Sequence, residues 1–336
     1  MSPASSRPSA AMPAIAPRPD GTPFLWSVMI STFNAPPDFL AATLRSVLEQ
    51  DPGRDVMQIA VVDDASPQGA PEALVRELGG DRVTVERQPK NLGMAGIWNR
   101  CIELARGRWV HLLHQDDLVA PGFYEKLKAG TESPAAPGLL YCRHAFIDAQ
   151  GRQLGLSDLD AASPGCVPDP LPNMARKQLI QTPSVVVRRS AYEALGGFRT
   201  DLCYSLDWEM WCRVAKDFPV WFEPAVLASY RVHGSAATSR LRRSGADIAD
   251  LKKCIRINTD YIADKKTRAE VRRFARRRYA LMATSYAEEL LAAGNPAAAW
   301  RQLRGAWECD KSFAVLKQFV RLSPAWWRGA RKPLPR

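Results

Sequence analysis

Short apolar runs alternate with amphipathic segments through the first 130 residues of this sequence. The runs have the length of β-strands, and the intervening segments repeat apolar residues at spacings of three and four; the runs are residues 25–32, 56–62, 82–88 and 108–114, and the amphipathic segments are 37–50, 71–80, 91–107 and 121–130. Alternating strands and helices are typical of βαβ units and a mostly parallel sheet. The nearly continuous apolar strands indicate that helices flank both faces of this sheet.

Polar residues follow three of these runs at the point where each run ends. They form three clusters: Ser31, Thr32 and Asn34; Asp63 and Asp64; Asp116 and Asp117. In open α/β sheets, ligands bind at the carboxyl edge of the strands. Each cluster alone is also consistent with residues that end a strand and cap the next helix. The presence of all three clusters at one edge of the sheet favours a binding site over helix capping.

The remaining chain divides into two further parts. Strand-like patterns cover residues 139–148 and 182–198. A helical pattern covers residues 207–217, and the pattern of residues 220–233 indicates a strand, a turn and a second strand. Beyond Arg240 the pattern is helical, and Gly294-Asn295-Pro296 predicts the turn of a helical hairpin. We therefore expect a disordered Pro/Ala/Ser-rich lead at 1–23, an α/β domain at 24–240 and a helical tail at 241–336.

The composition restricts the class of protein. The 336 residues are 46% hydrophobic and 24% charged, as in soluble globular proteins, and no apolar run has the length of a membrane span. The lead lacks the apolar core of an export signal. Seven cysteines are scattered without a C-x-x-C spacing, which is typical of reduced thiols in a cytosolic protein.

The net charge of +11 is concentrated in the tail. From Arg240 onwards there are 23 Lys or Arg and 9 Asp or Glu, whereas the rest of the chain has 23 and 26. A basic segment attracts polyanions such as phospholipid head groups, nucleic acid or phosphorylated substrates. No nucleic-acid-binding motif is present and the positive charge is away from the ligand edge, so we expect no nucleic-acid partner.

Seven segments, taken in order, resemble a known family. They are SVMISTFN, VVDDAS, NLGMAGIWNRCIELARG, HLLHQDD, GGF, LDWEMWCRV and YRVHGS, and they cover residues 25–240. This region resembles family 2 glycosyltransferases, which have the GT-A fold. The resemblance implies transfer of a sugar, with inversion, from a nucleoside-diphosphate sugar (a UDP-sugar first of all) to a hydroxyl of a glycan or lipid-linked glycan, in cell-surface polysaccharide assembly.

The resemblance also implies a divalent metal, Mg or Mn, because the leaving nucleoside diphosphate develops negative charge. Asp117 resembles the family's metal ligand, and Asp116 resembles its metal or donor-ribose carboxylate. His233 matches a family segment that approaches the metal or the diphosphate. The family has Asp-x-Asp-Asp where this chain has His114, which we interpret as a core histidine of the strand.

The donor site implied by the resemblance is spread over several strand ends: Ser31, Phe33, Asn34, Asp63, Asn99, Asp116 and Arg231. Phe33 would stack on the base and Asp63 would accept from it. Three alternatives stay open: Phe33 packs in the core, Asn99 bonds to backbone, and Asp64 is structural or close to the ribose.

Asp207 is the candidate general base, because inversion needs a base within reach of the acceptor hydroxyl. The family has Glu before this Asp, whereas this chain has Leu206, and nearby apolar side chains would raise the pKa of Asp207. The alternatives are an N-cap role for Asp207 and Glu209 as the base. Thr182 and Trp208 are the candidate acceptor-binding residues.

Other functions remain open at this stage. A nucleotidyltransferase is disfavoured because STFNAPPDFL lacks a Gly-rich basic loop. An inactive or weakly active nucleotide-sugar-binding relative is a real alternative, because the first carboxylate of the metal motif is missing. The basic tail, with Trp326 and Trp327, predicts peripheral contact with the inner face of a membrane; a solvated hairpin packed on the catalytic domain is the alternative.

Overall fold

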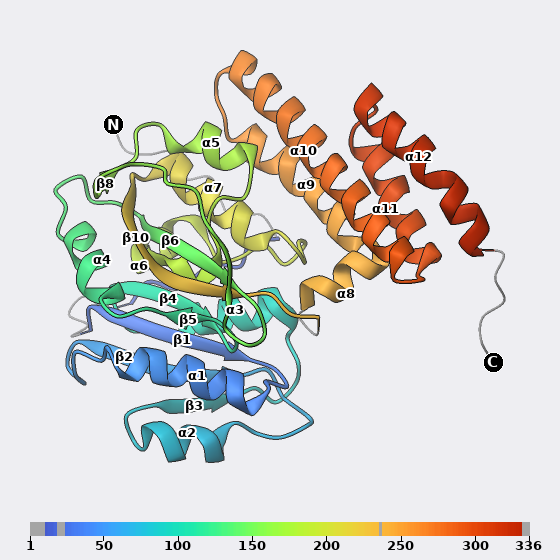
Figure 1. Cartoon of the computed structure of the whole chain (residues 1–336). Helices are drawn as coiled ribbons and strands as arrows, with labels where there is room; N and C mark the ends of the chain where they lie inside the picture. The colour runs from blue at the N-terminus through green and yellow to red at the C-terminus, as the bar shows by residue number, and fades with distance from the viewer. Residues whose placement is uncertain (1–10, 19–23, 235–236, 331–336) are drawn as a thin grey trace. The chain divides into compact units, whose positions relative to one another are not determined.

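The structure is a computed structural model that describes residues 11–18, 24–234 and 237–330 (Figure 1). The chain folds into two compact units. The first comprises Met1–Pro170, Gln178–Asp201 and Arg213–Val232, and the second comprises Leu171–Lys177, Leu202–Cys212 and His233–Arg336. The second unit therefore begins at His233, before the predicted boundary at 240, and includes two short segments from the predicted α/β region.

The first unit is built on a ten-stranded sheet, eight strands of which follow the order β3-β2-β1-β4-β9-β6-β10-β5. The pairs β1/β2, β1/β4, β2/β3 and β6/β10 are parallel, and β9 is antiparallel to both its neighbours. The bounds are β1 Trp26–Thr32, β2 Met57–Asp63, β3 Thr84–Arg87, β4 Trp109–His114, β5 Leu118–Val119, β6 Leu139–Ile147, β7 Gln153–Leu156, β8 Gly165–Cys166, β9 Val185–Arg188 and β10 Val220–Arg231. The predicted parallel pairing is confirmed for β1 to β4, whereas the sheet as a whole is mixed, because β5, β7, β8 and β9 pair with their neighbours in antiparallel orientation.

The helices between the first strands also agree with the pattern. The helices of this unit, and the two that contribute to both units, are α1 Pro37–Leu48, α2 Glu72–Gly79, α3 Gly93–Leu104, α4 Phe123–Thr131, α5 Pro170–Arg176, α6 Arg189–Leu195 and α7 Leu206–Asp217, with a 3-10 turn, η1, at Thr182–Ser184. Every residue of β1 and β2 is buried, and Leu40, Leu44 and Val47 of α1 belong to the same core. Apolar spacing thus located the core correctly.

Two local predictions were wrong. Residues 189–195 form α6 rather than strand, and the residues that this helix buries are Arg189, Ala191 and Tyr192. Residues 220–231 form one strand, β10, rather than two strands and a turn. Its register with β6 shifts at Val226, so Pro224 is accommodated at a bulge instead of ending the strand.

The predicted disorder of the lead is wrong for residues 11–18. Ile15 is 3% exposed, and the carbonyls of Ala11 and Pro13 accept hydrogen bonds from the backbones of Thr200 and Gly197 at 2.9 and 2.8 Å. Backbone pairing and burial of an apolar side chain therefore outweigh the Pro-rich composition. Residues 1–10 and 19–23 of the lead lie outside the described residues.

The second unit is helical, with α8 Ala237–Ser244, α9 Ala246–Asp260, α10 Lys265–Ala292, α11 Pro296–Cys309 and α12 Phe313–Ala330. The predicted hairpin is confirmed: α10 ends before Gly294, which has φ +74°, and the Asn295 side chain caps α11 by accepting from the Ala298 N–H at 3.1 Å. Among the described helices, none combines the length and the apolar character needed to cross a membrane.

The two short segments of the second unit are held by hydrogen bonds to its helices. The Asp250 carboxylate of α9 accepts from the backbone N–H groups of Cys203 and Ser205 at 2.8 and 2.9 Å. The Trp208 indole N–H donates to the Met174 carbonyl at 2.6 Å. These contacts explain why the two short segments belong to the second unit.

Candidate functional site

The polar ends of β1, β2 and β4 lie side by side in the sheet. The parallel register pairs Thr32 with Asp63 and Ser31 with His114. The three sequence clusters therefore reach one edge, as predicted. This edge is where parallel α/β sheets bind ligands.

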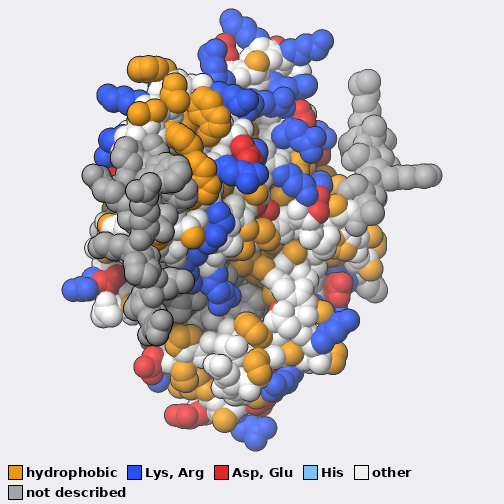
Figure 2. Space-filling view, turned by 90° about the vertical axis from the view of Figure 1, so that its right-hand side faces the viewer, with side chains coloured by type: hydrophobic (Ala, Val, Ile, Leu, Met, Phe, Trp, Pro, Cys, Tyr) orange, Lys and Arg blue, Asp and Glu red, His pale blue; other side chains and the backbone are white. Residues whose placement is uncertain are grey.

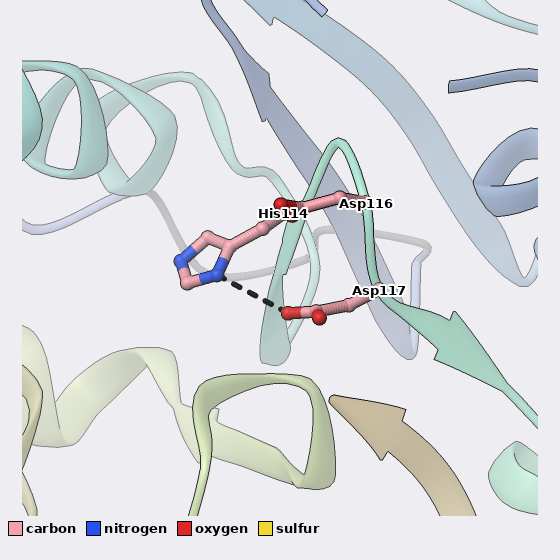
Figure 3. Close-up of side chains that lie close together, drawn as sticks. All are labelled: His114, Asp116 and Asp117. Atoms are coloured by element: carbon pink, nitrogen blue, oxygen red, sulfur yellow. Dashed lines mark ion pairs between the residues drawn. The ribbon is translucent and has the colours of Figure 1, made fainter. Parts of the chain in front are cut away.

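His114, Asp116 and Asp117 form the centre of this edge (Figure 3). All three belong to β4 and the turn that follows it. One nitrogen or oxygen atom from each lies within 4.8 Å of the others, and His114 Nδ1 is 3.2 Å from Asp117 Oδ2. The interpretation of His114 as a core histidine agrees with the stacking of its ring on Trp98 but did not anticipate its contact with Asp117.

Asp117 is the buried member of this group, with 1% of its surface exposed. Burial, the largest effect, and the charge of Asp116 raise its pKa to about 6, although the His114 hydrogen bond and the backbone N–H of Arg231 act in the opposite direction. A carboxylate is buried at this cost only where a compensating charge or donor set exists. The cluster is therefore suited to a cation.

Arg231 holds the Asp116–Asp117 turn in place. Its backbone N–H donates to Asp117 Oδ1 at 2.9 Å, and its Nε donates to the Asp116 carbonyl at 2.8 Å. The guanidinium also donates to the carbonyls of Asp148 and Ala149 at 3.1 and 3.2 Å, and it lies over the Phe39 ring at 4.6 Å. Arg231 is 6% exposed, so it acts as a scaffold of the turn rather than as the donor ligand we predicted.

Two residues that sequence reasoning missed connect the three strand ends. The Gln115 side-chain oxygen accepts from the Thr32 hydroxyl and the Phe33 N–H at 3.0 and 2.7 Å. The Ser66 hydroxyl accepts from the Asn34 N–H at 2.8 Å. Gln115 lies in the HQDD motif and Ser66 lies in the VVDDAS motif. A polar side chain inside an identified motif is the sequence signal that could have indicated these two residues.

The adjacent carboxylates Asp63 and Asp64 have different partners. Asp63 is fully buried, accepts from the Ser66 N–H at 3.0 Å and lies 3.6 Å from Arg87 Nε. Asp64 accepts from the N–H groups of Leu92 and Gly93 at 2.6 and 3.1 Å, at the start of α3, where the helix dipole favours an acid. Of the two alternatives for Asp64, the structural one therefore fits its contacts.

The backbone is strained at two of the strand ends. Asn34 and Ala65 have φ values of +49° and +58°, which side chains with a Cβ seldom adopt. Such conformations persist where surrounding contacts fix them, and they are common at binding sites. Here Ser66 bonds to both loops, so the strain occurs where the strand ends are tied together.

The predicted donor residues of β1 differ in accessibility. Phe33 is 37% exposed and Asn34 lies in the loop, whereas Ser31 is 7% exposed within the strand. Asn99 is 5% exposed, and its amide exchanges hydrogen bonds of 2.9 and 2.7 Å with the backbone of Phe198. Asn99 thus fastens α3 to the Gly197–Phe198 turn, which corresponds to the structural alternative and not to a donor ligand.

The predicted acceptor residues are buried. Trp208 is 1% exposed and packs on Tyr279 with ring centroids 5.0 Å apart, so it has no exposed face on which a sugar could stack. Thr182 in η1 is 2% exposed. Both predictions failed because the patterns that indicated them, a Trp near a helix start and a polar turn, also occur in packed cores.

Asp207 and Glu209 belong to the second unit. Asp207 is 7% exposed at the start of α7 and accepts from the Trp208 N–H at 2.8 Å. Glu209 is fully buried and accepts a hydrogen bond from the Tyr261 hydroxyl, so it is the less accessible of the two acids. His233, the other predicted metal ligand, is in the same unit, where its carbonyl accepts from the Ser239 hydroxyl at 3.3 Å.

Comparison with known proteins identifies the fold and the family that the sheet region resembles. Residues 27–158, which include all three strand-end clusters, match the model of glycosyl transferase family 2. The matched region belongs to this family. The chain has the GT-A fold of glycosyltransferases, as the sequence motifs implied.

Relatives of this glycosyltransferase occur in bacteria and archaea. An uncharacterized Mycobacterium tuberculosis protein is 28% identical over 63% of this chain and 69% of its own length. An uncharacterized glycosyltransferase of Methanocaldococcus jannaschii is 25% identical over 62% and 71%. The succinoglycan biosynthesis protein ExoO of Rhizobium meliloti is 30% identical over 45% of this chain and 36% of ExoO.

Solved structures share the fold of this glycosyltransferase. A fragment of Staphylococcus aureus TarS, residues 1–349, aligns with a TM-score of 0.60 over 91% of this chain and 86% of the fragment, at 13% identity. The mannosyltransferase PcManGT of Pyrobaculum calidifontis aligns with a TM-score of 0.55 over 94% and 86%, at 20% identity. TarS was also solved with UDP-GlcNAc, and the PcManGT structure contains GDP-Man and Mn²⁺.

The raised pKa of Asp117 predicts a pH dependence of folding. Its folded-state pKa of about 6 exceeds the ordinary Asp value of about 3.9, so the stability contributed by the protonated carboxyl is lost as pH rises through this window. In metal-free buffer we expect Asp117→Asn to gain stability relative to wild type between about pH 4 and about pH 7.5, by about 2 kcal/mol. Urea unfolding at the two pH values measures this difference, and equal pH dependence of both proteins would contradict it.

Proposed function

We propose that this glycosyltransferase transfers a sugar, with inversion, from a nucleoside-diphosphate sugar bound at the carboxyl ends of β1, β2 and β4. The main support is the cluster of His114, Asp116 and Asp117 at this edge. The family match covers this edge, and two proteins of the same fold bind UDP-GlcNAc and GDP-Man.

The nucleoside would lie against the loops after β1 and β2. Phe33 has an exposed ring beside these loops, and an exposed aromatic ring suits stacking on a base. Asp63, to which the family resemblance assigns recognition of the base, is buried at the end of β2 and is held by Ser66 and Arg87, so it would act on the base only after a local rearrangement of this loop. A UDP-sugar is therefore the donor we propose first.

A divalent cation fits the residues at the centre of this edge. Asp117 Oδ2 is buried, and apart from the His114 ring the described residues give it no hydrogen-bond donor. Asp116 and Asp117 supply hard oxygen ligands of the kind that Mg²⁺ and Mn²⁺ prefer. The bound cation would neutralise charge on the leaving diphosphate. Arg231, through its bonds to the turn, would keep both carboxylates in position for it.

Asp207 is the general base that we propose. The start of a helix stabilises a carboxylate, and partial burial limits its contact with water. A base of this type removes the acceptor hydroxyl proton as the sugar is transferred. Glu209 is less suited, because it is fully buried and bonded to Tyr261.

The acceptor that we propose is a hydroxyl of a surface polysaccharide or of its lipid-linked precursor. The support is the name of one relative, the succinoglycan biosynthesis protein ExoO, of which this chain spans about a third. A binding module without activity is the alternative function. The departure at His114 from the family's acidic motif is the observation that favours this alternative.

Nucleotide binding and catalysis should depend on different carboxylates. With Mn²⁺ present, we expect UDP to raise the melting temperature of wild type by several degrees at about 100 times its Kd. Asp117→Ala should lose this metal-dependent rise. Asp207→Asn should keep it, yet lower the rate of sugar transfer or of donor hydrolysis by about 10²–10⁴-fold. Thermal shift and UDP release measure the two properties.

The same assays separate the proposal from its rivals. GDP, dTDP and CMP serve as competing nucleotides, and Asp55→Ala, an exposed carboxylate outside the site, serves as the matched control. A shift with no turnover in wild type supports the inactive relative. No shift with any nucleotide and metal contradicts the proposed donor site.

We also propose that the second unit binds anionic lipid at the inner face of the membrane. Phe313, Leu316 and Val320, at spacings of three and four on α12, are 80%, 39% and 60% exposed. Lys311 precedes these three residues, Lys317 lies between Leu316 and Val320, and both lysines are exposed. Figure 2 shows Lys and Arg side chains gathered beside hydrophobic ones on this face. Exposed apolar side chains with surrounding positive charge suit an anionic bilayer surface.

The side chains of Trp326 and Trp327, which first indicated this contact, lie outside the described residues.

Vesicle binding tests this surface. We expect wild type to sediment with vesicles containing anionic phosphatidylglycerol, to do so less as salt rises, and not to sediment with neutral phosphatidylcholine vesicles. The double variant Phe313→Ser/Val320→Ser should bind at least about tenfold more weakly. Leu154→Ser removes an equally exposed side chain, 61%, from the first unit and should bind like wild type. Equal binding by all three proteins would contradict the proposed surface.

A further inference from the structure

His114 occupies the position where the family's motif has an acidic residue. Its Nδ1 is 3.2 Å from Asp117 Oδ2, and its side chain is 22% exposed, so the ring is at the site and within reach of a small ion. Neighbouring ligands of an octahedral ion, each roughly 2.1–2.3 Å from it, lie about 3 Å apart. The separation of these two atoms fits a pair of ligands that share one ion.

The imidazole ring is held in this position by aromatic packing. It stacks on Trp98 with centroids 4.9 Å apart and planes 19° apart, and Trp98 meets Phe198 edge to face at 5.0 Å. Phe198 is fastened in turn by Asn99. This packing fixes the ring plane while leaving the edge with Nδ1 toward Asp117 (Figure 3). A ligand held in this way loses little freedom on binding an ion.

The geometry points to His114 as a third protein ligand of the cation, and we propose that it makes this site select a transition-metal ion such as Mn²⁺ over Mg²⁺. This inference rests on the proposed metal-dependent function. Mg²⁺ takes oxygen ligands almost exclusively, whereas imidazole nitrogen is a good ligand for transition metals. Exchange of a carboxylate for imidazole also lowers the negative charge of the site, which weakens Mg²⁺ binding most.

A purely structural role is the competing explanation. In that case His114 is only a hydrogen-bond partner of Asp117, and the ion is held by carboxylates and the diphosphate. A second competitor is His233, which the family resemblance implied as a ligand. The chain has only four histidines, so spectroscopy can distinguish these cases.

Pulsed electron paramagnetic resonance of the Mn²⁺-loaded full chain, with UDP, detects nitrogen bound directly to the ion. We expect a nitrogen-14 coupling typical of coordinated imidazole in wild type and in His233→Ala. The coupling should disappear in His114→Asp and His114→Ala. Retention in both His114 variants, or loss in His233→Ala alone, would overturn the inference.

Affinity provides the second readout. We expect wild type with UDP to bind Mn²⁺ at least about tenfold more tightly than Mg²⁺, measured by competition against the free Mn²⁺ signal. His114→Asp restores a carboxylate and should reduce this preference by about tenfold while it keeps Mn²⁺ bound. Trp98→Leu, which removes the stacking partner, should weaken Mn²⁺ binding while the nitrogen coupling of the bound fraction remains.

The same experiments give different results if this inference is wrong and if the proposed function is wrong. If Mn²⁺ binds wild type without nitrogen coupling and His114→Asp has the same metal preference, the inference is wrong and the carboxylate site survives. If neither Mn²⁺ nor Mg²⁺ binds wild type with any nucleotide, the proposed function itself is wrong. Melting temperatures of the variants within a few degrees of wild type show that each result concerns the site and not the fold.

Discussion

The buried carboxylate of Asp117 is the constraint on which this site depends. A charged group with 1% exposure is unfavourable unless donors or a cation compensate it, and its pKa of about 6 reflects this cost. The chain supplies two compensating contacts, the His114 ring and the backbone N–H of Arg231. A bound ion would supply the remaining stabilisation of the Asp117 carboxylate. The binding site is then formed before the ion binds, and the ion-free protein is less stable as a consequence.

The surrounding polar residues make this arrangement rigid. Gln115 joins the turn after β4 to the end of β1, and Ser66 joins the end of β2 to the loop after β1. The three strand ends thus act as one unit although they come from distant parts of the sequence. Rigid support of this kind is what an enzyme needs to hold a diphosphate and a metal without reorganisation.

The sequence predicted the parallel pairing of β1 to β4, the hairpin of the tail and the meeting of three polar clusters, because these follow from periodicity and from the geometry of parallel strands. It did not predict the antiparallel strands of the rest of the sheet. It could not separate ligand from scaffold at Arg231 and Asn99. Both are polar residues in motifs that resemble those of the family, yet their hydrogen bonds go to backbone atoms far away in the sequence. Trp208 was misjudged for the same reason, since burial by α10 depends on tertiary packing that no local pattern contains. At His114 the sequence showed only a departure from the family motif. The distance between His114 and Asp117 in the structure then indicated that His114 belongs to the site.

A crystal structure of the protein with UDP and Mn²⁺ would test the central claim most directly. We expect anomalous density for Mn²⁺ in contact with Asp117 at the carboxyl end of β4, with the uracil ring against the loop that contains Phe33. Nucleotide bound away from the ends of β1, β2 and β4, or Mn²⁺ bound without Asp117, would contradict it.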